Sequence, residues 1–281
     1  MDSLNPANSF IAYMAQFRDA CYSNPIWRDR KLVLMIDEFT YIYGGIEDGS
    51  IHPSIMKQWK AITQDPNCNF SVILIGQDVT PTFLSKDYAS NAMQVIRQKR
   101  LTYLSETEAQ ELIEKPMTKA WGASPYIGHA VERIIEYTSR NPYYIQKVCI
   151  AIIEYMNEHK LKKITEADID EVAANLRWED DAFDNLINGG ENDKTDENKQ
   201  LKAERLELLK AIARLSTIRG YDYCSLNDIL TEIRCTEEDL RERKKSLLEE
   251  LYKREVLDKS GEDSYKIQVK LFRQWLYKSN Q

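Results

Sequence analysis

The sequence lacks the features of a membrane protein, of a secreted protein and of a protein with a structural zinc site. No apolar run approaches the roughly 20 residues that cross a bilayer, and the N-terminal sequence MDSLNPANSF does not have the basic and then apolar order of a secretory signal. The five cysteines form an odd, scattered set without a C-x-x-C pair, and the three histidines lie far apart in the sequence. We therefore expect a cytoplasmic protein with no membrane segment and no zinc site.

Length and charge predict more than one domain. The chain has 281 residues, of which 43% are hydrophobic, enough to fill the core of one large or two ordinary domains. Its net charge of -7 argues against a protein that coats nucleic acid non-specifically. Residues 201–281 contain 17 basic and 15 acidic residues, whereas residues 1–200 contain 21 basic and 30 acidic residues. The two blocks therefore differ in composition.

A polar segment separates these blocks. The sequence NGGENDKTDENKQ, residues 188–200, has paired glycines followed by polar residues without an apolar side chain to bury. We interpret it as a linker. The expected organisation is an α/β core over residues 1–104, a helical subdomain over 105–187, the linker over 188–200 and a further domain over 201–281.

The first region has the pattern of a parallel α/β sheet. A helix is expected over Pro6–Cys21, and apolar runs without alternation, at Leu32–Ile36 and Ser71–Ile75, predict strands that are buried on both faces. The segment Ser54–Thr63 between them predicts a crossover helix, and a third strand is expected near Gln94–Leu101. Buried strands joined by a helical crossover are typical of a doubly wound α/β fold.

The middle region predicts helices alone. Ser105 followed by Glu108 has the spacing of a capping box, and Pro116 is expected to end the helix that starts there. Three further helices are expected, over Ile127–Thr138, Pro142–Asn157 and Thr165–Leu176.

The last region predicts a winged helix-turn-helix. Helices are expected over Glu204–Leu215, Leu226–Ile233 and Thr236–Leu251, followed by short strands near Val256–Asp258 and Tyr265–Val269. Three helices followed by a β-hairpin are the order of that motif.

Two acidic residues end the first apolar strand. In LVLMIDEF, Asp37 and Glu38 reach the carboxyl edge of the predicted sheet, where open α/β folds bind their ligands. In a P-loop ATPase the aspartate at this position holds Mg²⁺ through its water shell, and the adjacent glutamate polarises the attacking water. A second interpretation is that the strand stops here because the next element requires a helix cap or solvent.

Two other segments contain polar residues at element ends. The second strand ends in Gly76-Gln77-Asp78, where a polar side chain could sense a phosphate or orient water, or could simply form a turn. In TSRNPYYIQKVC, Asn141 and Pro142 have the local chemistry of a helix start.

Taken together, these motifs resemble a known family. The order LVLMIDEF, SVILIGQD, RLTYLSETEAQELIEKP, TSRNPYYIQKVC and a terminal winged helix with YKIQVKLFRQWL resembles the STAND class of AAA+-related ATPases, within the ASCE-type P-loop NTPases. The resemblance covers Asn5 to Leu276. It implies a nucleotide-driven conformational switch for signal transduction, in which the helical subdomain and the winged helix fold over ATP or ADP.

The resemblance also implies roles for individual residues. Asp37 would be the Mg²⁺ residue of the Walker B motif, Glu38 the catalytic base, and Gln77 or Asp78 the first sensor. Glu38→Gln would then trap the ATP-bound state.

The same resemblance assigns residues outside the first two strands. Asn141 and Pro142 would form the helical-domain motif that closes over the nucleotide, and Arg97 and Arg100 would contact phosphate or a neighbouring subunit.

The sequence departs from this family in one essential motif. A P-loop, or Walker A, has the form G-x-x-x-x-G-K-S/T, because its backbone N–H groups cradle the phosphates and its lysine neutralises them. The nearest segment, Gly44–Gly49, continues with Ser50-Ile51 and follows the acidic strand instead of preceding it. We expect the chain to be the C-terminal part of a longer protein, although a partner chain could supply the P-loop or the core could be rearranged. ATP, ADP and Mg²⁺ would bind, and ATP would be hydrolysed, only in the intact parent, which could form a homo-oligomer on activation.

Two other functions remain open. The winged helix could belong to a DNA-binding regulator, but its candidate recognition helix mixes Arg241, Arg243, Lys244 and Lys245 with acidic residues. An intramolecular packing module is therefore favoured. The chain could also be a pseudo-ATPase scaffold that keeps the fold for protein contacts.

Overall fold

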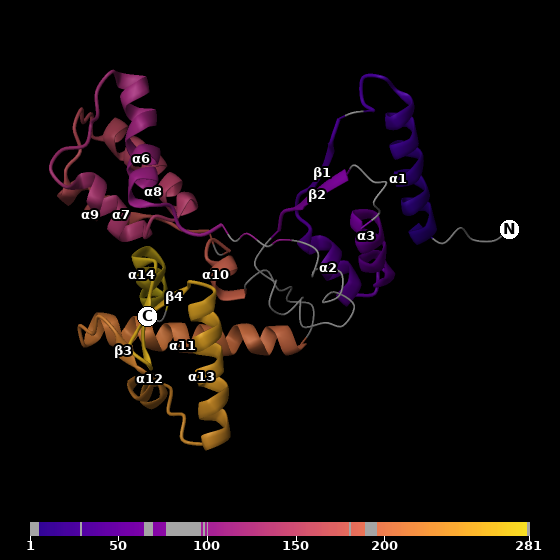
Figure 1. Cartoon of the computed structure of the whole chain (residues 1–281). Helices are drawn as coiled ribbons and strands as arrows, with labels where there is room; N and C mark the ends of the chain where they lie inside the picture. The colour runs from indigo at the N-terminus through magenta and orange to yellow at the C-terminus, as the bar shows by residue number, and fades with distance from the viewer. Residues whose placement is uncertain are drawn as a thin grey trace. The chain divides into compact units, whose positions relative to one another are not determined.

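A computed structural model of the chain forms two compact units. The first unit comprises residues 1–99 and 188–194, and the second comprises residues 100–187 and 195–281. Each has a hydrophobic core of its own, and Figure 1 labels the elements of both. The structure describes residues 6–28, 30–64, 70–76, 97, 99, 101–179, 181–188 and 196–279.

A parallel pair of strands forms the centre of the first unit. Strand β1 (Leu32–Ile36) pairs in register with β2 (Phe70–Leu74). Helices α2 (Thr40–Glu47) and α3 (Ser54–Gln64) lie between the strands in sequence, and α1 (Pro6–Ser23) contacts α3. The predicted parallel pair with a helical crossover is confirmed. Helix α2 was not predicted, because its Gly44-Gly45 pair disfavours a helix by intrinsic propensity.

Among the described residues, helices cover one face of this sheet. Every second side chain of the two strands faces these helices. These strand residues, Leu34, Ile36, Val72 and Leu74, pack against a small core. The core consists of Phe39 just before α2, Tyr43 and Ile46 of α2, and Met56 of α3. The opposite face exposes 53% of Val33, 63% of Met35, 45% of Ile73 and 42% of Ile75. The prediction of strands buried on both faces is therefore wrong within the described residues. The helices that connect β1 to β2, α2 and α3, both lie on one face of the sheet. The uniformly apolar sequence of the strands does not indicate which face is covered.

The predicted third strand is not observed in the part that the structure describes. Of residues 94–101, only Arg97, Lys99 and Leu101 are described, and none of the three belongs to a strand. The other residues of that prediction lie outside the described part.

Helices form the first half of the second unit. They are α6 (Glu106–Trp121), α7 (Ala130–Thr138), α8 (Pro142–Glu158), α9 (Glu166–Asn175) and the short α10 (Asp184–Asn188). Figure 1 shows α6 to α9 as one bundle, and their inner faces share one core. The helical character of this region is confirmed.

Helix α6 starts as predicted but ends later. The Ser105 hydroxyl accepts a hydrogen bond from the Glu108 amide at 3.3 Å, and the Glu108 carboxylate accepts one from the Ser105 amide at 2.9 Å. The helix continues past Pro116 to Trp121 and ends at Gly122, whose φ is 79°. The prediction that Pro116 ends the helix is wrong. Proline adopts helical φ values, and the buried side chains on both sides of it, Ile113 and Met117, pack in the core.

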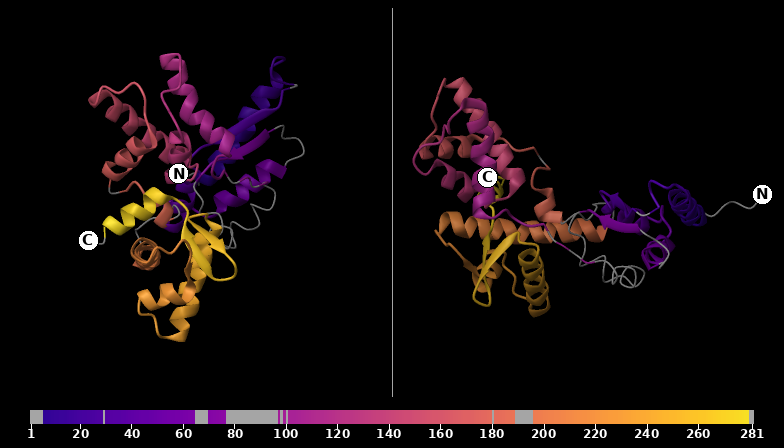
Figure 2. Two further views of the ribbon diagram at one scale, coloured as in Figure 1. Left: turned by 90° about the vertical axis from the view of Figure 1, so that its left-hand side faces the viewer. Right: turned by 45° about the horizontal axis from the view of Figure 1, so that its top comes forward.

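The second half of the second unit combines helices with a small antiparallel sheet. The elements follow in the order α11 (Asp196–Ile218), β3 (Cys224–Ser225), α12 (Leu226–Glu232), α13 (Glu238–Lys253), β4 (Leu257–Ser260), β5 (Ser264–Ile267) and α14 (Lys270–Lys278). The sheet order is β3-β5-β4, and the hairpin of β4 and β5 lies beside α13 (Figure 2).

Helix α11 corrects the predicted linker. It begins at Asp196, so the last five residues of the segment 188–200 are helical. Their acidic residues, Asp196 and Glu197, occupy the first turn of the helix, where their negative charges interact favourably with the positive end of the helix dipole. A polar composition therefore marked a helix start here as well as a connection.

One continuous core joins the two halves of the second unit. It extends from Ala109 of α6 to Leu276 of α14. At its centre the Phe183 ring, which is 1% exposed, lies 5.3 Å from Tyr144 and 5.0 Å from Phe272, measured between ring centroids. Within the described residues, none of the helices has the length and apolar character needed to span a membrane.

Candidate functional site

The turn after β1 presents two carboxylates at the carboxyl end of the strand. Asp37 and Glu38 follow Ile36 directly, and both side chains are exposed. Glu38 has a φ of 52°, which is the left-handed region that residues other than glycine rarely adopt. Its amide donates a hydrogen bond of 2.8 Å to the Asp37 carboxylate. The chain therefore reverses sharply at the position of the predicted catalytic base.

The end of β2 holds this turn in place. The Ile75 amide donates to the Ile36 carbonyl at 2.8 Å, and the Phe39 amide donates to the Ile75 carbonyl at 2.8 Å. Gly76 follows so closely that a Cβ atom there would lie 3.2 Å from both the backbone nitrogen and the methyl carbon of Thr40. The carboxyl ends of the two strands therefore meet, as the sequence predicted for the Asp37 and Gly76 positions.

The chemistry of this edge fits part of a nucleotide site. Carboxylate oxygens are hard ligands that suit Mg²⁺, directly or through its water shell, and within the described residues neither Asp37 nor Glu38 forms an ion pair. The same part of the chain contains no group of three or more potential metal-binding side chains. Phosphates would also need a cradle of free N–H groups, but the Phe39 amide at the start of α2 is bound to Ile75. The two carboxylates therefore fit a Mg²⁺–water shell, and the Phe39 amide is not free to bind a phosphate.

The predicted sensor residues and Arg100 do not belong to the part of the chain that the structure describes. The roles of Gln77, Asp78 and Arg100 therefore stay predictions. Arg97 is described, and its side chain is exposed.

Asn141 and Pro142 start a helix in the second unit. The Asn141 side-chain oxygen accepts hydrogen bonds from the amides of Tyr143 at 3.0 Å and Tyr144 at 3.4 Å, and Pro142 occupies the first helical turn. This is the local explanation that the sequence offered. The side-chain oxygen of Asn141 is thus used within the protein.

Three basic residues of α13 form ion pairs with acids from other elements, and a fourth binds an amide. The Arg243 guanidinium makes two hydrogen bonds of 2.8 Å to Glu204, and the Lys244 ammonium lies 2.7 Å from Glu207. Lys245 pairs with Asp263 at 3.2 Å. Arg241 donates to Asn227 at 3.1 Å. Sequence reasoning missed the two glutamates of α11, because the contacts span 37 and 39 residues.

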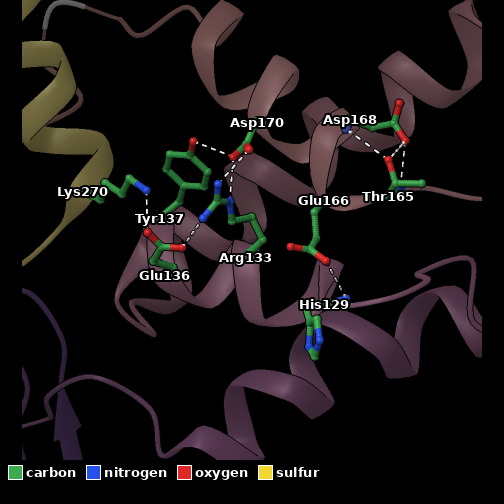
Figure 3. Close-up of polar contacts among 9 residues, drawn as sticks. All are labelled: His129, Arg133, Glu136, Tyr137, Thr165, Glu166, Asp168, Asp170 and Lys270. Atoms are coloured by element: carbon green, nitrogen blue, oxygen red, sulfur yellow. Dashed lines mark hydrogen bonds and ion pairs between the residues drawn. The ribbon is translucent and has the colours of Figure 1, made fainter.

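A second polar cluster connects α7, α9 and α14 (Figure 3). The Arg133 guanidinium binds both carboxylate oxygens of Asp170, at 2.7 and 2.8 Å, and also binds Glu136 at 2.7 Å. The Tyr137 hydroxyl donates to Asp170 at 2.8 Å, and the Lys270 ammonium binds Glu136. We call these five residues the α7–α9–α14 network. The spacing of Arg133, Glu136 and Tyr137 places them on one helix face, but nothing in the sequence identifies their distant partners.

The charges of this network change the acidity of its members. The hydrogen bonds from Arg133 lower the pKa of Asp170 below its ordinary value. Partial burial opposes ionisation of Glu136, but hydrogen bonds from Lys270 and Arg133 outweigh it and lower the pKa of that carboxyl. Burial and the bond to Asp170 raise the pKa of Tyr137 to about 12. The network is therefore built from ionised acids and a neutral tyrosine at neutral pH.

Comparison with known proteins gives weak similarities only. No protein-family model matches the chain, and no curated protein matches it. Solved structures that match include Drosophila ORC bound to DNA, at 11% identity over 93% of this chain and 63% of that chain, with a TM-score of 0.34. RuvB of Thermotoga maritima matches at 16% identity over 95% of this chain and 74% of that chain, with a TM-score of 0.39. Cdc6p from Pyrobaculum aerophilum matches at 13% identity over 96% and 70%, with a TM-score of 0.36.

These similarities do not carry the functional argument. All three TM-scores are below 0.4, and this chain spans less than two thirds of the ORC chain. The proposals below therefore rest on the residues of this chain and on the order of its motifs.

Proposed function

We propose that the chain is the C-terminal part of a STAND or AAA+-like ATPase that acts as a nucleotide-dependent switch. The observation that carries the proposal is the position of Asp37 and Glu38 at the carboxyl edge of β1, beside the Gly76 end of β2. This edge is where open α/β sheets bind ligands. The left-handed backbone of Glu38 adds support, because such conformations concentrate at functional sites.

The proposed roles follow the motifs of the resemblance. Asp37 would hold Mg²⁺ through its water shell, and Glu38 would accept a proton from the attacking water. Gln77 or Asp78 would sense the γ-phosphate, and Asn141-Pro142 would contribute to closure over the nucleotide. Bound Mg²⁺ would neutralise the charge of the phosphates.

The P-loop would come from outside this sequence, because G-x-x-x-x-G-K-S/T is absent from it. Titration calorimetry of the chain with ATP and Mg²⁺ should therefore detect no binding at micromolar concentrations. Tight, Mg²⁺-dependent binding by the chain alone would contradict this part of the proposal. A sequence immediately upstream and in frame that encodes a strand followed by a P-loop would identify the missing segment.

The catalytic proposal is tested in a form of the protein that includes a P-loop. Glu38→Gln should lower the rate of ATP hydrolysis by roughly 10²- to 10⁴-fold, the contribution of a general base, while ATP binding persists. Asp19→Asn is a matched control, because Asp19 is an exposed acid of α1 that pairs with its sequence neighbour Arg18 at 3.0 Å, far from the β1 turn in sequence. Unchanged hydrolysis in Glu38→Gln would show that Glu38 is not the base.

A DNA-binding regulator is the second candidate. The order α11-β3-α12-α13-β4-β5 with a β3-β5-β4 sheet supports a winged helix over residues 201–281. The pairing of Arg243 with Glu204 and of Lys244 with Glu207 argues against attraction to DNA phosphates. We therefore favour a packing role for this domain. A mobility-shift assay should give weak binding to duplex DNA, and a steep decline of tight binding with salt would favour the regulator instead.

A pseudo-ATPase scaffold is the third candidate. The exposed apolar face of the sheet, with Val33, Met35, Ile73 and Ile75, favours contacts with another protein segment. A scaffold would lack a P-loop in the intact protein as well. The upstream sequence therefore separates the scaffold from the ATPase.

A further inference from the structure

Helix α14 packs on both halves of the second unit, against α11 of the C-terminal half and against α7 of the helical bundle. It follows β5 directly, its Phe272 ring stacks 5.0 Å from Phe183 of the bundle region, and Trp275 lies 5.2 Å from the same ring. Phe183 in turn stacks on Tyr144 of α8 at 5.3 Å. Side chains from both halves thus complete one aromatic cluster.

Polar contacts fasten both ends of α14 to the bundle. At its start, Lys270 binds Glu136 and lies 4.4 Å from the centre of the Tyr137 ring, within the α7–α9–α14 network (Figure 3). At its end, the Lys278 ammonium donates to the Ala174 carbonyl of α9 at 2.7 Å. The Ser139 hydroxyl, at the end of α7, also donates to the Gln268 carbonyl just before α14.

A separate set of contacts joins the same halves near the end of α13. The Tyr103 hydroxyl donates to the Glu255 carbonyl at 2.9 Å. The Arg254 guanidinium donates to the carbonyls of Asn185 at 3.0 Å and Leu186 at 2.9 Å. The halves are therefore joined near the end of α13 as well as through α14, and these contacts lie within the second unit.

We propose that α14 fastens the helical bundle (residues 101–187) and the C-terminal half (residues 196–269) into one body that unfolds and moves as a whole. The winged-helix-like half would then not swing away from the bundle during a conformational change. This inference goes beyond the proposed nucleotide switch and does not depend on it, because every contact used lies within the second unit.

The physical reason is the continuity of the core. Separation of the halves would expose the fully buried Phe272 and Leu276 of α14, and also Phe183, to water. It would also leave the Glu136 carboxylate without the Lys270 ammonium. Regions joined by such a core are expected to open together in hydrogen exchange, as one cooperative unit.

Native-state hydrogen exchange on the full chain tests this proposal. Leu248→Ala empties a fully buried position of α13, and it should accelerate exchange at protected amides of α13 by roughly 30-fold or more. If the halves form one body, the amide of Ile152 in α8 should accelerate by the same factor. Acceleration confined to α11–β5, with α8 unchanged, would overturn the proposal.

A milder variant keeps the test informative if Leu248→Ala does not fold. Ile267→Val removes one methyl from the buried end of β5, and it should accelerate exchange in both halves by roughly two- to tenfold. Glu242→Gln is the control, because Glu242 is an exposed residue of the same half. It should leave exchange in both halves nearly unchanged.

The role of α14 itself is tested by weakening it. In a Phe272→Ala background, or in the milder Lys270→Met background, Ile267→Val should accelerate exchange in the C-terminal half more than in α8. Equal acceleration of both halves in these backgrounds would show that the contacts of Tyr103 and Arg254 suffice to join them, and would overturn the assignment to α14.

Discussion

The amide of Phe39 donates a hydrogen bond of 2.8 Å to the carbonyl of Ile75. This bond joins the turn after β1 to the end of β2, and it fixes the position of the two carboxylates that the turn presents. The first unit therefore depends on a close backbone contact for the geometry of its candidate site, and this contact can be disturbed by a single methyl group.

Gly76→Ala should destabilise the turn that carries Asp37 and Glu38. The added Cβ would lie 3.2 Å from two atoms of Thr40, so Thr40 would have to move by a few tenths of an ångström, at an expected cost of about 1–3 kcal/mol. Hydrogen exchange at the β1 and β2 amides would measure the loss. Ile75→Val is the control, because Ile75 is 42% exposed and adjacent, and it should change little. Equal effects of the two variants would contradict a tight contact at Gly76.

Glu38→Gly should stabilise the first unit although it removes the proposed base. A residue with a side chain at a φ of 52° is strained, and glycine adopts this conformation freely, so a gain of about 0.5–1 kcal/mol is expected. Hydrogen exchange of amides in the first unit, measured at increasing urea concentrations, would determine this gain in stability. Glu38→Gln keeps the strain and should show no such gain. A loss of stability in Glu38→Gly would mean that the side chain makes a stabilising contact.

Glu204→Gln should destabilise the second unit more than a comparable change on the surface. The side chain of Glu204 is 15% exposed and holds Arg243 through two hydrogen bonds, and its loss should cost about 1–3 kcal/mol. Glu238→Gln is a matched control, because Glu238 is 83% exposed and lies 3.8 Å from Arg241. It should cost less than about 0.5 kcal/mol. Urea midpoints compare the two, and similar midpoints would contradict the difference in burial.

The stability of the second unit should decline in acid through Asp170. Its folded-state pKa is lowered by the Arg133 hydrogen bonds, so its contribution is present above the unfolded pKa of about 3.9 and is lost as pH falls toward the folded value. Asp170→Asn should therefore destabilise the protein at pH 7. Near pH 2 the difference from the wild type should be much smaller. Urea midpoints across this range test it, and a constant difference would contradict the ionic role.

Part of this fold could be predicted because its signals are local. The apolar run Leu32–Ile36 and the acids after it gave the strand and the position of the candidate carboxylates. The spacing of Ser105 and Glu108 predicted a helix start that the structure contains. Such signals depend on a few neighbouring residues, so the sequence displays them directly.

Other features depend on distant parts of the chain. The strand sequence LVLMI does not show that Val33 and Met35 are exposed, because exposure depends on which helices cover the sheet. Pro116 suggested a helix end, but packing on both sides of it sustains the helix. Partners such as Asp170 for Arg133, 37 residues away, are likewise set by tertiary structure. Gln77 and Asp78 lie outside the described residues, so the sensor prediction remains untested.

The cluster around Phe183 also gives the second unit an optical reporter of its own. The indole rings of Trp178 and Trp275 lie 4.7 and 5.2 Å from this one phenylalanine ring, yet they come from segments almost 100 positions apart in the chain. Once Trp27, Trp59 and Trp121 are replaced by phenylalanine, the intrinsic ultraviolet emission of these two indoles should report a loosening around that ring without an attached dye.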